Sequence, residues 1–171
     1  DNLIIPDRVN YKLLKSAVIY GANASGKSKL IDAIAFMRYI VINSSKQTQN
    51  GESIPVEPFR LDKDSENETT EFEAIFIHDN EQFRYGFEAT KHKIIAECLY
   101  HKPKTKEVEI FYRDEAVFNI HPKRFSKGAM VEREGLLREN ALFVSVAAQF
   151  NENLAIRVVD WFKKLRIISG I

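Results

Sequence analysis

One stretch decides the fold of this 171-residue chain: Gly21-Ala22-Asn23-Ala24-Ser25-Gly26-Lys27-Ser28. It matches the pattern G-x-x-x-x-G-K-[ST], in which glycines let backbone N–H groups approach phosphate oxygens without a Cβ atom in the way. The pattern predicts that Lys27 faces the β- and γ-phosphates of a nucleotide as a catalytic cation and that the Ser28 hydroxyl ligates Mg²⁺. We therefore predict that the loop, together with the adjoining Lys29, binds ATP and Mg²⁺.

The residues on either side of this loop favour a strand before it and a helix after it. Ala17–Tyr20 is a short apolar run that ends at a glycine, which is typical of a buried strand. After the loop, apolar residues recur at helical spacing, namely Leu30, Ile31, Ile34, Met37 and Val41. This spacing predicts an amphipathic helix over residues 27–42 that packs on the strand.

The middle of the chain alternates between apolar and polar residues. Four runs have this period of two: Glu71–Ile77, Gln82–Glu88, Ile94–Tyr100 and Val108–Arg113. Short polar turns join them, and such runs predict an antiparallel meander. Phe118 and Ile120 suggest a short fifth strand.

The last part of the chain returns to helical patterning. Asn140 is a candidate cap for a helix through Phe150, and Asn151 or Asn153 for a second helix through about Leu165. Polar loops are expected at residues 43–51 and 62–68. The sequence thus predicts a single α/β domain with α+β character: the loop with its strand and helix in residues 1–45, an antiparallel β subdomain in 70–120 and helices in 136–171.

Composition narrows the class of protein. Hydrophobic residues make up 44% of the chain, which is ample for a packed core and excludes wholesale disorder. The formal net charge is +1, so a nucleic acid would have to be bound by a local patch. Cys98 is the single cysteine, which excludes an intrachain disulfide and favours a buried thiol. We find no apolar run long enough to span a membrane and no signal-peptide pattern, and we expect a cytoplasmic protein without a membrane partner.

An ATPase also needs an acidic residue that follows an apolar strand and holds Mg²⁺ through water. Two stretches come near this pattern, one ending at Asp79 and the other at Asp160. Asp79 follows a histidine in an expected hairpin turn, and the run before Asp160 is short and fits a helix better. We therefore expect that neither supplies this acid.

The loop and the helix after it resemble the P-loop region of ABC-type ATPases of the SMC/RecF branch. The likeness is greatest to bacterial abortive-infection and overcoming-lysogenisation-like ATPases, which carry a G-x-N-A-S-G-K-S loop. It extends through Pro58-Phe59-Arg60-Leu61 and the meander to residues 142–150, with Lys29 standing where that family has asparagine. The resemblance implies the N-terminal part of an ATPase head, since the signature motif and the acidic strand of such heads come later in the chain.

The same resemblance implies partners and further site residues. Two heads would sandwich two ATP molecules, in DNA transactions or antiphage defence and often beside an effector nuclease. Gln149 matches the Q-loop position, where it would reach Mg²⁺ and the attacking water as a catalytic and metal-binding residue; the alternative is a helix glutamine facing solvent. Asn23 would approach the γ-phosphate, or would merely tolerate an unusual loop dihedral.

Two basic segments are candidates for DNA contact, residues 101–106 and 121–127. The alternative for both is a solvated loop. Three rival functions stay open beside the ATPase: a nucleotide-gated scaffold without turnover, a P-loop kinase-like phosphotransferase and a nucleic-acid binder that is not an enzyme.

Overall fold

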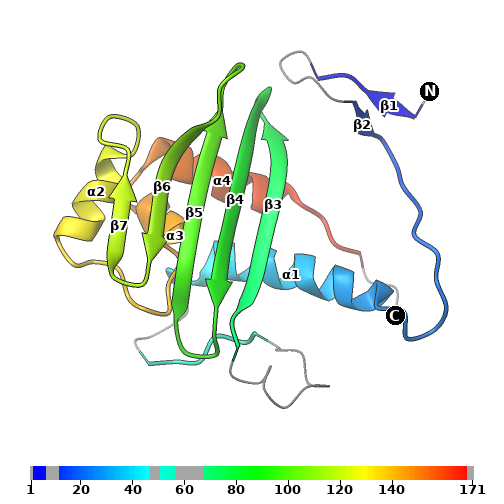
Figure 1. The fold of residues 1–171 in the computed structure, drawn as a ribbon, viewed down its shortest axis with the longest axis horizontal. Coiled ribbons are helices and arrows are strands. Elements are labelled where there is room, and N and C mark those ends of the chain that lie inside the picture. Colours follow the sequence, from blue (N-terminus) through cyan, green and yellow to red (C-terminus); the bar gives the residue numbers. More distant parts are fainter. Residues whose placement is uncertain (1, 7–11, 47–50, 57–67, 169–171) are drawn as a thin grey trace.

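The structure, a computed structural model, describes residues 2–6, 12–46, 51–56 and 68–168. Its centre is an antiparallel sheet of five strands in the order in which they follow one another along the chain (Figure 1). The strands are β3 (Thr70–His78), β4 (Glu81–Ala89), β5 (Ile94–Lys102), β6 (Val108–Asp114) and β7 (Val117–Ile120). The predicted meander is therefore confirmed, including its fifth strand.

The register of the sheet begins at a two-residue turn between β3 and β4. Asp79 and Asn80 form this turn with φ of 52° and 59°, and His78 pairs with Glu81 across it. Short polar side chains tolerate this left-handed conformation, and two such residues in a row match the twist of a hairpin. The local sequence therefore fixes which face of β3 and β4 turns inward.

Helices cover one face of the sheet. These are α1 (Lys27–Asn43), α3 (Phe143–Gln149) and α4 (Asn153–Lys164), whereas α2 (Ser126–Arg133) lies beyond β7 (Figure 1). Aromatic side chains fill the space between the layers. The ring of Phe76 stacks on that of Trp161 with 4.2 Å between the ring centroids, and Phe111 meets Phe143 edge-on with 4.9 Å between the centroids. This is a mixed α/β fold, as predicted.

Only the second half of α1 belongs to this core. Met37, Ile40 and Val41 are buried. Leu30, Ile31 and Ile34, which continue the same apolar pattern toward the N-terminus, are 47%, 44% and 37% exposed. The helix lies within one residue of its predicted bounds, but its first half is not packed as we expected.

The strand predicted at Ala17–Tyr20 is wrong for this structure. β1 (Leu3–Ile4) and β2 (Leu13–Leu14) form a small antiparallel pair, after which the chain reaches α1 without further helix or strand. Val18 and Tyr20 are 72% and 88% exposed. The reason is physical: a strand needs a neighbouring strand to pair its backbone N–H and C=O groups, and no strand among the described residues lies beside this segment.

The predicted cap of the first C-terminal helix is also wrong. Helix α3 begins at Phe143, and Asn140 instead donates from its side chain to the carbonyl of Glu52 at 3.0 Å. The first N–H groups of α3 are bound by the carboxylate of Glu97, which reaches them from β5. A side chain distant in sequence, Glu97, therefore caps the helix in place of the neighbouring Asn140.

The second C-terminal helix begins where predicted but with another cap. Glu152 precedes α4, Asn153 is its first residue, and Asn151 adopts a left-handed φ of 61°. Helix α2 was not predicted, because its eight residues carry little apolar pattern. The loop predicted at residues 62–68 lies almost wholly outside the described residues, as do Pro58–Leu61 and residues 47–50.

Candidate functional site

The loop from Gly21 to Gly26 is curved by its own backbone. Ser25 N–H donates to the carbonyl of Ala22 at 3.2 Å, and both Ala24 and Gly26 adopt left-handed φ values, 64° and 87°. Left-handed residues in such a loop turn backbone N–H groups toward a common centre, which is the geometry of an anion-binding nest. The positive φ falls on Ala24 rather than on Asn23, so tolerance of an unusual dihedral does not explain the asparagine.

Lys27 folds back over this loop. Its ammonium donates to the carbonyl oxygens of Gly21 and Ala22, at 2.6 Å each, and to the Ser25 hydroxyl at 3.3 Å. A Cβ atom at position 21 would lie 2.5 Å from Ser25 Oγ, so any larger residue there would displace the Ser25 side chain. The ammonium therefore lies over the loop, and its contact with the phosphates of a nucleotide stays a prediction.

The N-terminus of α1 is open to a ligand. Gly26 caps it without a side-chain hydrogen bond, and the first turn contains no acidic residue. The N–H groups at the start of a helix have no partner within the helix, and together with the helix dipole they favour an anion at this point. Ser28 lies in the same first turn and is exposed, which suits a hydroxyl that ligates Mg²⁺ beside phosphate oxygens.

Lys29 is turned away from this centre. Its ammonium pairs with Asp32 at 3.7 Å on the surface of α1, where both side chains are largely exposed. The structure thus brings together the loop residues and Lys27, whereas a nucleotide contact by Lys29 stays a prediction.

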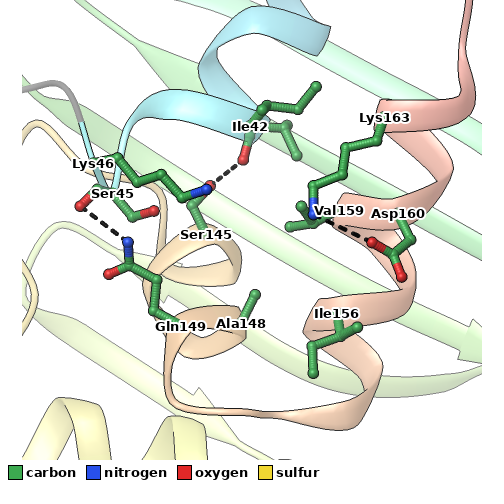
Figure 2. A pocket seen from close by; sticks show the side chains of 11 residues that line it. Ile42, Ser45, Lys46, Ser145, Ala148, Gln149, Ile156, Val159, Asp160 and Lys163 are labelled. Carbon is green, nitrogen blue, oxygen red and sulfur yellow. Dashed lines mark hydrogen bonds and ion pairs between the residues drawn. The ribbon is translucent and has the colours of Figure 1, made fainter.

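Gln149 lies beside the other end of α1. Its side-chain amide donates to the carbonyl of Ser45 at 3.4 Å. It lines a hollow of about 180 Å³ between α1, α3 and α4 (Figure 2). Lys46, in the turn after α1, and Lys163, on α4, also line this hollow, and sequence reasoning missed them because they lie far apart in the chain.

The length of α1 separates Gln149 from Lys27. A helix of 17 residues is about 25 Å long, and the two side chains lie near its opposite ends. This structure therefore does not bring them together, and the catalytic and metal roles of Gln149 stay predictions.

The two acidic residues weighed for Mg²⁺ are engaged elsewhere. Asp79 lies in the β3–β4 turn, 3.8 Å from Arg157, and Asp160 pairs with Lys163 on α4 at 3.4 Å. In the described part of the chain, no three His, Cys, Asp or Glu side chains form a cluster that could hold a metal. The residues present thus fit Mg²⁺ that arrives with a nucleotide and is held in part by its phosphates.

Cys98 faces the side of the sheet that the helices leave open and is partly buried. Burial raises the pKa of its thiol to about 11, so the thiolate nucleophile is scarce at neutral pH. This agrees with the expectation of an unreactive thiol.

Residues 16–143 match the protein family described as "AAA domain, putative AbiEii toxin, Type IV TA system". The chain belongs to this family. The match covers well over half of the sequence, from just before the loop to the first residue of α3. Membership in the AbiEii-like AAA family supports a P-loop ATPase domain that binds nucleotide, usually with Mg²⁺. No curated protein and no solved structure matches the chain.

Among the described residues of this AbiEii-like AAA protein, no helix has both the length and the apolar character that crossing a membrane requires.

Proposed function

We propose that this chain is the N-terminal part of an ABC-type ATPase head of the SMC/RecF branch. In this proposal it binds ATP and Mg²⁺ at Gly21–Ser28, and nucleotide drives its association with a second head in DNA transactions or phage defence. The observation that carries the proposal is the loop itself: left-handed Gly26 opens α1 while the Lys27 ammonium closes over the carbonyls of Gly21 and Ala22.

Each part of the loop has a role in this proposal. Backbone N–H groups and the N-terminus of α1 hold phosphate oxygens, and Lys27 offsets the charge of the β- and γ-phosphates. Ser28 shares Mg²⁺ with the nucleotide. Phosphoryl transfer to water further needs an acid near the attacking water and a charge at the γ-phosphate. Asp79 and Asp160 are paired elsewhere. We therefore assign the acid near the attacking water and the charge at the γ-phosphate to a second lobe and to the partner head.

Exposed apolar surface beside the loop supports the proposal that a second lobe packs against this chain. Val18, Ile19 and Tyr20 precede the loop and Leu30 and Ile31 follow it, and all five are more than two-fifths exposed. Fully burying one such side chain contributes roughly 1.5–3 kcal/mol. A second lobe packed here would allow residues 17–20 to form the buried strand that their sequence favours. Gln149 would reach a nucleotide only after a shift of α3, or if the nucleotide is bound by the partner head.

The test is calorimetric titration of this chain with ATP–Mg²⁺ beside a phosphate-release assay. We expect weak binding, no measurable turnover and loss of binding in Lys27→Ala. Lys164→Ala, which removes an exposed lysine at the end of α4, is the control and keeps wild-type binding. Robust turnover that Lys27→Ala removes would show that the chain carries its own catalytic acid, and would overturn the proposal of an incomplete head.

A further inference from the structure

Two basic segments that are separate in sequence lie at one end of the sheet. The first is the β5–β6 turn with the end of β5, residues 101–107, and the second is the loop from β7 into α2, residues 121–127. His121 N–H donates to the carbonyl of Ile110 at 2.8 Å, and Val108 pairs with His101. The start of β6 therefore lies between the two segments, and Figure 1 shows both at the same end of the sheet.

Six cations gather on these segments. They are Lys102, Lys104, Lys106, Lys123, Arg124 and Lys127. None of the six forms an ion pair with a carboxylate among the residues that the structure describes. The nearby acids are already engaged, since Glu107 holds Arg84 at 2.6 Å and Glu81 holds Arg157 at 2.6 Å. A protein with a net charge of +1 thus has a distinctly positive end.

The backbone of the second segment is fixed before any partner binds. Arg124 and Phe125 N–H both donate to the carbonyl of His121, and Lys127 N–H donates to the carboxylate of Glu152 at 3.0 Å. Phe125 is fully buried against Phe111 and Phe143. Lys123, Arg124 and Lys127 are therefore presented from an ordered backbone, which lowers the entropy lost on binding.

We propose that this basic end, defined as the six cations above, binds the phosphate backbone of a nucleic acid without sequence preference. A row of cations on two adjoining turns matches repeated phosphate charges. A membrane surface fits less well, because binding there also needs apolar side chains that insert between lipids. Phe125, the one large hydrophobic residue of the two segments, is buried.

The experiment measures the anisotropy of a short fluorescein-labelled DNA duplex titrated with the full chain, at salt concentrations between about 50 and 200 mM. Six phosphate contacts give a slope of log affinity against log salt of about −5. We expect Lys104→Gln and Lys123→Gln each to weaken binding at least about fivefold and to reduce this slope by about 1. Lys91→Gln is the matched control, because Lys91 lies at the opposite end of the sheet between β4 and β5, and we expect less than a twofold change.

Three results would overturn the inference. They are no binding at about 50 mM salt, an equal loss in Lys91→Gln, and tighter binding to phosphatidylserine vesicles than to the duplex. Titration of the same variants with ATP–Mg²⁺ separates this inference from the proposed function. Lys104→Gln and Lys123→Gln leave nucleotide binding unchanged, and a chain that binds DNA but not ATP would contradict only the nucleotide site.

Discussion

The carboxylate of Glu97, on β5, accepts a hydrogen bond of 2.9 Å from the backbone N–H of Val144 at the start of α3. Glu97 is 1% exposed, and it also accepts from Tyr85 Oη at 3.0 Å and lies 3.8 Å from the Arg113 guanidinium. Burial raises the pKa of Glu97, whereas Arg113 and the hydrogen bonds favour its charged form. One buried carboxylate thus joins the sheet to the helix that carries Gln149.

Loss of this carboxylate should destabilise the chain more than the loss of a surface one. Glu97→Ala leaves Arg113, Tyr85 and the first N–H groups of α3 buried without their partner, and breaking a buried pair in this way costs about 3–5 kcal/mol. Urea denaturation measures the free energy of unfolding. Glu115→Ala is the control, because Glu115 pairs with Lys93 at the surface, and we expect no measurable change. Equal effects of the two variants would contradict the role of Glu97.

The stability of the chain should fall as the pH is lowered from 7.5 to 5.5. Burial lowers the pKa of His101, whose Nε2 lies 2.9 Å from Glu81 and whose buried Nδ1 has no hydrogen-bond partner among the described residues. Between the unfolded pKa, about 6.5, and the lower folded one, the unfolded chain binds more protons, so acid favours unfolding. Urea denaturation at both pH values measures this loss.

The matched variants for this pH dependence are His101→Gln and His92→Gln. The first removes the titrating ring, so we expect a smaller loss of stability between the two pH values. The second removes a histidine from the exposed β4–β5 turn and keeps the wild-type loss. Below about pH 4.5 the free energy of unfolding should decrease further in the wild-type chain and in both variants, because Glu81 becomes protonated more readily in the unfolded chain. Although burial acts to raise the pKa of Glu81, the bonds from Arg157 and His101 outweigh it and lower that pKa.

Gly26→Ala should weaken nucleotide binding without changing the thermal stability of the core. The left-handed φ of 87° at Gly26 is costly for a residue with a Cβ atom, by about 1–2 kcal/mol, although no atom lies near enough to clash. Calorimetry with ATP–Mg²⁺ should show an affinity lower by about tenfold. Gly135→Ala, at another left-handed glycine far from the loop, lowers the melting temperature and leaves the affinity unchanged.

Ser28→Ala should remove the advantage that Mg²⁺ gives to ATP binding. The wild-type chain binds ATP more tightly with Mg²⁺ than with a chelator present, because the hydroxyl shares the ion with the phosphates. In the variant the two affinities become equal, whereas Ser126→Ala, at the exposed start of α2, keeps the difference. An unchanged difference in Ser28→Ala would show that another group holds the metal.

The sequence predicted well what is decided by neighbouring residues. Asp79 and Asn80 specify their turn, and the alternation on either side specifies β3 and β4, because both signals act within a few residues. The loop from Gly21 to Ser28 is equally local. Its backbone takes a left-handed φ at Gly26, which favours glycine whatever the rest of the chain does.

Features that depend on distant partners were beyond the sequence. Ala17–Tyr20 has the composition of a buried strand, yet a strand needs a neighbour to pair its backbone, and the described residues provide none beside this segment. The cap of α3 comes from Glu97, 46 residues before Phe143. The separation of Lys27 from Gln149 follows from where α3 packs along α1, which no local pattern specifies.

Because only its second half is packed, α1 is fixed to the core at its C-terminal end and exposed at its N-terminal end. Met37, Ile40 and Val41 hold the C-terminal half in the core, and the loop with Lys27 lies at the exposed N-terminal end. Over the roughly 15 Å from Met37 to Lys27, a tilt of about 5° displaces the N-terminal end of the helix by about 1.3 Å. That is enough to break or make a hydrogen bond to a phosphate, so repacking around Val41 can change nucleotide affinity without touching the loop.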